Sequence, residues 1–303
     1  MTGGSARQKQ ICGVVPVLAA PLTTDLCVDE TMLDREIGWL VDSGARWLAI
    51  GFGSEIGSLD PQEARRLERC TAAARGAARV VGNVGQASTV SSTLRRLDLA
   101  VDAGADAVML HPTDERGRGS GAVAAEIASI AAVSPVPLVV QDAPQHTGVN
   151  LTVEDLGVLA GCDGIAALKI EPPDAVAKIR AVSERRTMMS APILAGRGAV
   201  QLHREVRAGA EGTMPGAGLF PEIARVFRFS IEGKWQQAVG EWSRLAPLML
   251  IGERSFKDFV QLQKTILTSR GVFQNDLISE AMGSRDAGMS YEVECLLDAI
   301  EVW

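Results

Sequence analysis

Eight short apolar runs alternate with longer amphipathic segments, and this alternation constrains the fold more than any other feature. The runs are almost continuously apolar, which is typical of strands that are buried on both faces of a parallel sheet. They span residues 14–19, 47–50, 79–82, 107–110, 137–141, 164–169, 192–195 and 211–214. The segments between them have helical periodicity and span 30–42, 61–75, 88–102, 123–132, 152–160, 174–182, 199–208 and 219–231.

Eight strand–helix units in succession predict an α/β fold, the (β/α)8 TIM barrel, over residues 11–232. Cap signals support the helices: Asp60 precedes a proline, and Thr152 is followed three residues later by Asp155. Residues 233–303 contain helical segments at 235–250, 254–270 and 291–302 without a strand between them, which predicts a C-terminal helical extension. No linker composition separates the two parts, so we expect a single domain over residues 1–303.

Composition and charge exclude several classes of protein. A net charge of −7 argues against a nucleic-acid partner, and no apolar run is long enough to cross a membrane. The five cysteines are scattered without a metal-ligand spacing, so we expect neither a metal site nor disulfides. Residues 1–10 lack the apolar core of a signal peptide, and we expect a cytoplasmic protein.

Lys169 closes the apolar run 164–169 and is the first candidate for chemistry. A lysine in apolar surroundings favours its neutral amine, which is a nucleophile that attacks ketones to form a Schiff base. The alternative is a structural lysine whose ammonium group reaches water. Barrel enzymes carry their chemistry at the carboxyl ends of the strands, where residues 51–55, 111–118, 141–148, 169–171, 196–197 and 215–218 also fall.

Four motifs in these segments resemble the superfamily of Schiff-base aldolases and dehydratases that includes dihydrodipicolinate synthase and N-acetylneuraminate lyase. They are Gly13-x-x-Pro16, Gly51-Phe52-Gly53-Ser54-Glu55-x-x-x-Leu59, Gln141-Asp142-Ala143-Pro144-x-x-Thr147-Gly148 and Gly164-Ile165-x-x-x-Lys169. The runs 139–144, 169–173 and 209–218 look most like the branch of L-2-keto-3-deoxyarabonate dehydratases. The resemblance implies a Lys169 imine with a 2-keto acid, no cofactor, and a homotetramer or homodimer.

The chain departs from the superfamily where protons are relayed. Gln141 stands where the synthases place a tyrosine, and an amide does not exchange a proton at neutral pH. Phe52 and Gly53 replace the two threonines of the first loop, which leaves Ser54 as its only hydroxyl. We therefore predict a dehydratase of a 2-keto-3-deoxy sugar acid. The alternatives are a pyruvate-dependent aldolase and a keto-acid-binding homologue that has lost catalysis.

The catalytic candidates are Lys169, Gln141, Ser54 and Glu171. Glu171 falls on the same side of its strand as Lys169, where it could act as acid or base or pair with Arg197. The Ser54 hydroxyl could contact substrate or bond its own backbone, and Glu55 is expected to fasten its loop.

A second set of residues is expected to bind the substrate. The backbone N–H groups of Gly53 and Ser54 are expected to form a carboxylate nest. His146 occupies the place of a carboxylate-binding arginine in the family, and Arg197 could clasp a carboxylate. Met214 lies in the run that resembles the dehydratase branch and completes this set.

Overall fold

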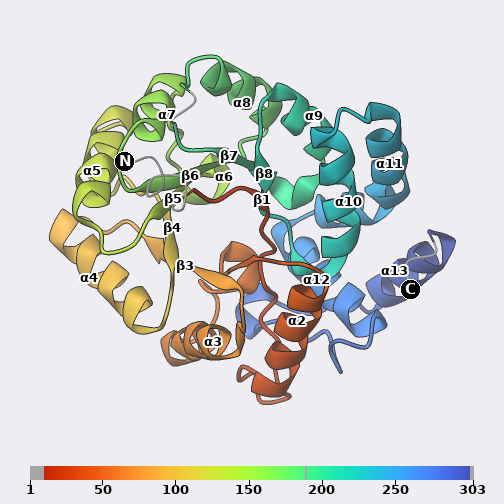
Figure 1. Cartoon of the computed structure of the whole chain (residues 1–303). Helices are drawn as coiled ribbons and strands as arrows, with labels where there is room; N and C mark the ends of the chain where they lie inside the picture. The colour runs from red at the N-terminus through yellow and green to blue at the C-terminus, as the bar shows by residue number, and fades with distance from the viewer. Residues whose placement is uncertain (1–9, 188–189, 301–303) are drawn as a thin grey trace. The chain divides into compact units, whose positions relative to one another are not determined.

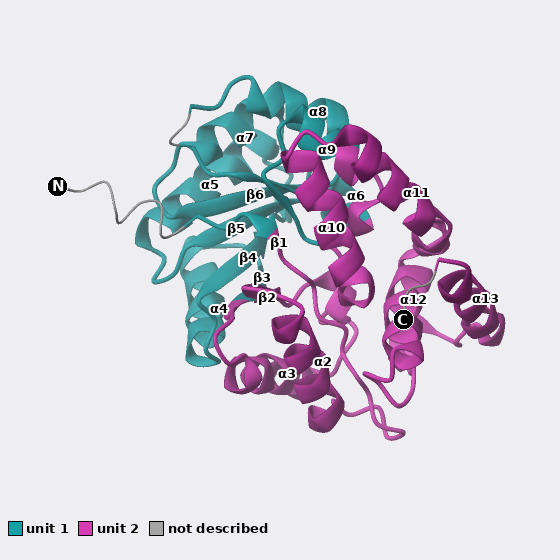
Figure 2. Ribbon diagram, turned by 45° about the vertical axis from the view of Figure 1, so that its right-hand side comes forward, with its two compact units in different colours: residues 1–13, 81–197, 204–214 teal, residues 14–80, 198–203, 215–303 magenta. Residues whose placement is uncertain are grey.

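The structure is a computed structural model that describes residues 10–187 and 190–300. The chain forms two compact units, shown in teal and magenta in Figure 2. Unit 1 contains residues 1–13, 81–197 and 204–214, and unit 2 contains residues 14–80, 198–203 and 215–303. Each unit is described by itself below, and the single-domain organisation stays a prediction.

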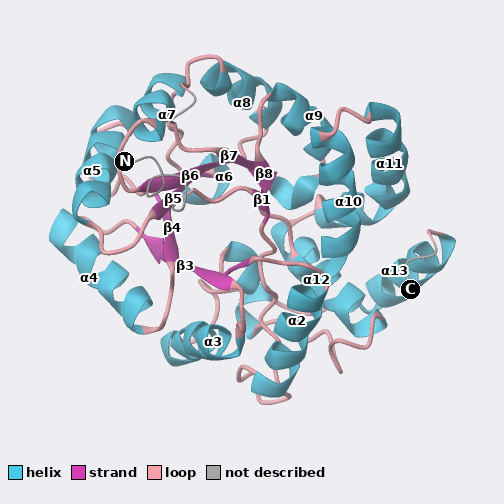
Figure 3. Cartoon of the chain, in the orientation of Figure 1, coloured by secondary structure: helices cyan, strands magenta, loops and turns pink. Residues whose placement is uncertain are grey.

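The eight predicted strands are all present and form one sheet in the order β1-β8-β7-β6-β5-β4-β3-β2. Helices follow the strands along the chain (Figures 1 and 3), and this alternation is the predicted (β/α)8 barrel topology. The strands are β1 Gly13–Val14, β2 Trp47–Ala49, β3 Arg79–Gly85, β4 Ala107–His111, β5 Leu138–Asp142, β6 Ile165–Ile170, β7 Ile193–Ala195 and β8 Gly212–Thr213.

Unit 1 has strands β3 to β7 side by side, with helices along them (Figure 2). β5 and β6 are buried along their whole length, as continuous apolar runs in a parallel sheet should be. The hydroxyl oxygen of Thr152 accepts the N–H of Asp155, and the N–H of Thr152 donates to the carboxylate of Asp155, which begins α7 as predicted. The helices are α4 Val90–Asp102, α5 Ser120–Val133, α6 Pro144–Thr147, α7 Val153–Ala160, α8 Ala175–Ser183 and α9 Leu202–Ala208, the last of which begins in unit 2.

The pairing of β5 with β6 contains a one-residue register shift. Leu138 lies opposite Ile165, whereas Val139 lies opposite Ala167, so Ala166 has no partner on β5. The carbonyl of Ala166 instead accepts the N–H of Ile11 at 3.1 Å. Beyond the shift, Gln141 lies opposite Lys169.

Unit 2 contains the helices of the first two strand–helix units and the predicted C-terminal extension. Its hydrophobic core joins Leu18, Leu48 and Phe220 with side chains of α2 and α12. The last predicted helix, 291–302, starts earlier than expected, and positions 301–302 lie outside the described residues. The helices are α2 Glu30–Asp42, η1 Phe52–Ser54, α3 Pro61–Ala74, η3 Ala217–Leu219, α10 Phe220–Ile231, α11 Trp235–Gly252, α12 Phe256–Ser269, η4 Glu280–Met282 and α13 Ala287–Ala299.

Two elements differ from the prediction for identifiable reasons. The first strand was expected over 14–19 but ends at Val14, because Pro16 has no N–H to donate to a ladder. Pairing resumes at Val17, which forms isolated parallel bridges with Ala49 and Gly216. The helix expected from 199 begins at Leu202, because Arg197, Gly198 and Ala199 all have left-handed backbone conformations within η2 Arg197–Ala199.

Candidate active site

Lys169 and Gln141 lie on neighbouring strands of unit 1, directly opposite each other. The register pairs Gln141 of β5 with Lys169 of β6, and Lys169 in turn with Leu194 of β7. Neighbouring side chains in register point to the same face of a sheet. Lys169 is 6% exposed and Gln141 is 1% exposed. The nucleophile candidate is therefore buried, which does not fit an ammonium group that reaches freely into water.

The carboxylate of Glu171 connects these side chains. Nζ of Lys169 lies 3.3 Å from Oε1 of Glu171, and Nε2 of Gln141 donates to the same oxygen at 2.5 Å. The other carboxylate oxygen accepts the backbone N–H of Arg197 at 3.0 Å. The Glu171 carboxylate is thus paired with Lys169 and is also bound by the backbone of Arg197.

The environment holds Glu171 in its ionised form. Burial raises the pKa of this carboxyl group, but Lys169, the amide of Gln141 and the N–H of Arg197 together outweigh burial and lower it. An ionised carboxylate is only an acceptor of hydrogen bonds. In the resting site, the Glu171 carboxylate can therefore accept a proton and has none to donate.

Gly196 makes room for this carboxylate. A Cβ atom at position 196 would lie 2.1 Å from Oε2 of Glu171 and 2.5 Å from its Cβ, far inside contact distance. The next residue, Arg197, has φ 48°, an uncommon left-handed conformation for a residue with a side chain. This conformation accompanies the bond of its N–H to Glu171. The turn after β7 is thus shaped around the Glu171 carboxylate.

Two histidines of unit 1 have lowered pKa values. Burial is the main cause of the lowered pKa of His146. The charge of Glu171 opposes this shift, and the charge of Lys169 adds to it. His111, at the end of β4, has a pKa lowered to about 4 by burial and by Arg96. Gly85 leaves space for the His111 ring, since a Cβ there would lie 2.7 Å from Cε1. Both imidazoles are therefore neutral near pH 7.

A second buried ion pair lies directly after Gln141 in the chain. Nζ of Lys178 is 2.6 Å from Oδ2 of Asp142 and 2.7 Å from Oδ1 of Asn150. Leu151 donates its N–H to the other oxygen of Asp142. Burial raises the pKa of Asp142, and the bonds from Lys178 oppose this rise. The pair fixes the end of β5 to α8 and thereby the backbone that carries Gln141.

In unit 2, the Ser54 hydroxyl is used by the backbone around it. It donates to the carbonyl of Leu18 at 2.6 Å and accepts the N–H of Gly51 at 3.2 Å. Ser54 is fully buried, and its own N–H donates to the carbonyl of Gly51. The expected carboxylate nest is therefore not assembled, since one of its two donors is occupied within η1. Of the two alternatives for the hydroxyl, the structural one fits these bonds.

Glu55 fastens its loop, as predicted, and belongs to a buried charge cluster that the sequence did not reveal. One of its carboxylate oxygens accepts the N–H of Ser279 at 2.7 Å, and the other pairs with Nζ of Lys264. Burial lowers the pKa of Lys264, which is 0% exposed, against the opposing effect of Glu55. Burial likewise raises the pKa of Glu36 to about 8, although Ala19 donates its N–H to this carboxyl.

The remaining substrate-binding candidate is Met214, which belongs to unit 1. It is buried, and its N–H donates to the carbonyl of Ala195 at 2.9 Å. Of the eight predicted site residues, four are joined by direct contacts, and a fifth, His146, feels the charges of Lys169 and Glu171; the four are Lys169, Gln141, Glu171 and Arg197. Gly196 was missed, although a glycine directly after a buried strand is a recognisable signal of close approach.

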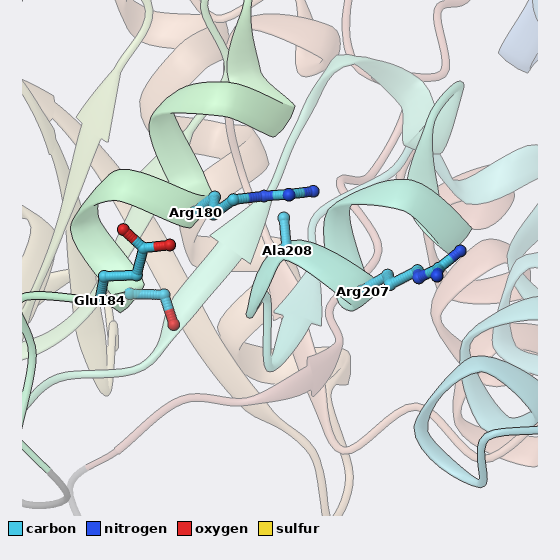
Figure 4. A pocket seen from close by; sticks show the side chains of 5 residues that line it. Arg180, Glu184, Arg207 and Ala208 are labelled. Carbon is cyan, nitrogen blue, oxygen red and sulfur yellow. The ribbon is translucent and has the colours of Figure 1, made fainter.

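A separate hollow of about 500 Å³ lies on unit 1, where α8 and α9 end. Figure 4 shows Arg180 and Glu184 from the first helix and Arg207 and Ala208 from the second. In the chain, α8 precedes β7 and α9 precedes β8, so the ends of these helices, and the hollow with them, lie on the side of the amino ends of the strands. Lys169 lies near the carboxyl end of β6, where barrel enzymes place their chemistry.

Within residues 10–187 and 190–300, no cluster of three or more His, Cys, Asp or Glu side chains is suited to holding a metal ion. No helix in this part of the chain combines the length and apolar character that a membrane span requires.

The topology and the lysine near the end of its sixth strand define a (β/α)8-barrel protein with a buried candidate nucleophile. The sequence model of the Dihydrodipicolinate synthetase family matches residues 10–300. The chain belongs to this family of Schiff-base lyases and aldolases.

The chain is also similar to individual known proteins, in sequence and in fold. The chain is 28% identical over 168 residues to a 4-hydroxy-tetrahydrodipicolinate synthase of Methanothermobacter thermautotrophicus, in a match that covers 54% of this chain and 59% of that protein. The dihydrodipicolinate synthase structure from Rhodopseudomonas palustris has a TM-score of 0.83 at 22% identity, covering 95% of this chain and 97% of that one. YagE, a prophage protein of the dihydrodipicolinic acid synthase family from E. coli K12, has a TM-score of 0.86 at 18% identity, covering 97% and 99%. These structures confirm the fold.

Proposed function

We propose that this protein is a dehydratase of a 2-keto-3-deoxy sugar acid and works through an imine at Lys169. The observation that carries the proposal is the buried Lys169 beside an ionised Glu171, 3.3 Å away. The carboxylate is an acceptor for the ammonium proton, and its removal leaves an amine that attacks the ketone carbon. The structure of YagE was solved in complex with pyruvate, a 2-keto acid, which supports this substrate class.

The proposed reaction loses one water from the substrate. Nζ of Lys169 bonds to C2, and the ketone oxygen takes one proton from the amine and the one held by Glu171, leaving as water to give an iminium ion and an ionised Glu171. Glu171 removes a proton from C3, the electron pair forms an enamine, and the enamine expels the hydroxyl at C4. The proton held by Glu171 goes to this leaving hydroxyl, and hydrolysis of the imine restores Lys169.

An aldolase is the second candidate, because the curated relative is named as a synthase. It would share each step up to the enamine and then make or break a carbon–carbon bond. Release of free pyruvate from a 2-keto-3-deoxy acid would identify this reaction. A cytoplasmic homotetramer or homodimer is part of the same proposal.

Reductive trapping tests the proposed nucleophile. Borohydride in the presence of pyruvate or a 2-keto-3-deoxy acid should add the reduced keto acid to Lys169, as seen by peptide mass. Lys169→Ala should lose the adduct and remain folded. Lys234→Ala is the control, since Lys234 pairs with Glu232 on the surface, and it should retain the adduct. An adduct on Lys178 or Lys257, or no adduct at saturating keto acid, would contradict the proposal and favour a non-catalytic homologue.

A further inference from the structure

Gln141 holds a buried hydrogen-bond acceptor that no described residue satisfies. The atom is Oε1 of its side chain, and no donor of residues 10–187 or 190–300 reaches it. Buried polar atoms in folded proteins nearly always have a partner, and leaving one without a partner is costly. Gln141 is 1% exposed, so bulk water does not compensate this oxygen freely. The atom thus requires its own explanation.

The orientation of this amide is fixed by Glu171. An amide can be turned so that its nitrogen and oxygen exchange places, and only its neighbours decide between the two orientations. The neighbour at 2.5 Å is Oε1 of Glu171, whose lowered pKa keeps it an acceptor. Turning the amide would place two oxygens against each other. The nitrogen therefore faces Glu171, and the oxygen of Gln141 is directed elsewhere.

The position of Gln141 indicates what the oxygen can meet. It lies opposite Lys169 in the strand register, and both side chains reach the same carboxylate. A substrate joined to Lys169 would extend its carbon chain beside that amide. An amide oxygen accepts hydrogen bonds and cannot donate them. The group that it meets must therefore be a donor, and the donors along a sugar-acid chain are its hydroxyls.

We infer that Oε1 of Gln141 accepts a hydrogen bond from a substrate hydroxyl beyond C3 and so selects hydroxylated 2-keto acids over their deoxy counterparts. This inference rests on the proposed Lys169 imine. Glu171 is the positioning residue that gives the amide its direction, and Gln141 is the residue that contacts the substrate. A site built to bond a hydroxyl rejects the analogue without it, because the protein acceptor is then buried unsatisfied.

Two keto acids of equal length test the selection: 4-hydroxy-2-oxopentanoate and 2-oxopentanoate. The measurement is the concentration that gives half-maximal borohydride adduct at Lys169. In the wild-type protein, this concentration should be roughly tenfold to a hundredfold lower for the hydroxylated acid, which is the effect of one buried hydrogen bond. Gln141→Met keeps the side-chain length without an acceptor oxygen and should reduce the ratio to about threefold or less. Pyruvate has no such hydroxyl and is the reference: a change in its trapping by Gln141→Met measures the lost bond to Glu171, so only the ratio between the two longer acids measures the contribution of Oε1.

The outcomes separate this inference from the proposed function. Equal half-saturation of the wild-type protein by both acids would overturn the inference, while the adduct itself would leave the Lys169 imine standing. A preference that survives in Gln141→Met would also overturn it. No adduct with any keto acid would overturn the imine and the inference with it. If Gln141→Met does not fold, equal half-saturation of the wild-type protein by the two acids still overturns the inference.

Discussion

Gly196 leaves open the space that the carboxylate of Glu171 occupies, since a Cβ at position 196 would lie 2.1 Å from Oε2 of Glu171. The same oxygen accepts the N–H of Arg197, so the turn after β7 both admits the carboxylate and binds it. The distance from Glu171 to Lys169 therefore depends on a residue that has no side chain.

Gly196→Ala should displace Glu171 and separate it from Lys169. We expect kcat to fall at least tenfold and the free energy of unfolding to fall by about 1–3 kcal/mol, as for an overpacked core. The measurements are steady-state turnover and urea unfolding. Gly157→Ala in α7 is the control, because nothing lies within 4 Å of the added Cβ, and it should be neutral or slightly stabilising. Unchanged turnover in Gly196→Ala would show that kcat does not depend on the position of the Glu171 carboxylate.

Glu171→Gln should lower kcat by roughly a hundredfold or more, because a positioned acid or base contributes at least that much. Borohydride trapping at Lys169 should persist, since imine formation is a separate step from proton removal at C3. Glu154→Gln, on an exposed surface pair with Arg185, is the matched control and should retain full turnover. If Glu171→Gln keeps its turnover, the proton is carried by another group, and His146 is the next candidate.

Ser54→Ala should act on stability rather than on substrate affinity. The change leaves the carbonyl of Leu18 and the N–H of Gly51 without their recorded partner. We expect the free energy of unfolding to fall by about 1–3 kcal/mol. Ser243→Ala, whose hydroxyl bonds an exposed turn of α11, should change it by less than about 0.5 kcal/mol. A raised KM with unchanged stability in Ser54→Ala would instead restore the hydroxyl to a substrate-binding role.

The buried carboxyl of Glu36 should make stability fall as the pH rises. Its pKa is raised by burial from 4.5 to about 8, so the folded protein holds this proton more tightly than the unfolded chain. The stabilisation is complete below about pH 4.5 and is lost as the pH rises through about 8. Glu36→Gln should flatten the dependence of the unfolding midpoint on pH between about 6.5 and 8. This pH range is chosen because it lies above the usual pKa of histidine.

Glu68 provides the control for this experiment. Burial raises its pKa to about 7, so it contributes a pH dependence of the same sign. Glu36→Gln should therefore reduce the slope, and adding Glu68→Gln should reduce it further. A slope that is equal in the wild-type protein and Glu36→Gln would show that the Glu36 carboxyl is ionised throughout the range.

The sequence predicted the elements of unit 1 well because its strands are buried on both faces and read as continuous apolar runs. It also placed Lys169 and Glu171 on one side of β6, since alternation along a strand is a local property. It could not decide the partner of Glu171, because the N–H of Arg197 reaches the carboxylate only through a left-handed turn. Such a conformation is imposed by surrounding packing and not by the preference of an arginine.

The charge cluster of unit 2 shows the other limit of sequence reasoning. Lys264 occupies a helix whose pattern gives no sign that its ammonium group is buried. Its partner Glu55 is far away in the chain, and only the folded unit brings the two charges together. The loop that carries Ser54 was likewise interpreted from its residue types, whereas its hydrogen bonds to Leu18 and Gly51 decide its role.

The unpaired Ala166 on β6 has a consequence for anyone who aligns, transplants or redesigns this site. If the register of Leu138 and Ile165 continued unchanged, Gln141 would lie opposite Leu168, whose side chain alternates to the other face of the strand. The acceptor and the nucleophile would then be directed away from each other, with no change in either residue. Deleting Ala166 would remove the shift and still leave Gln141 opposite Lys169, so an alignment of β5 with β6 must count Ala166 as one extra residue that precedes the functional side chains.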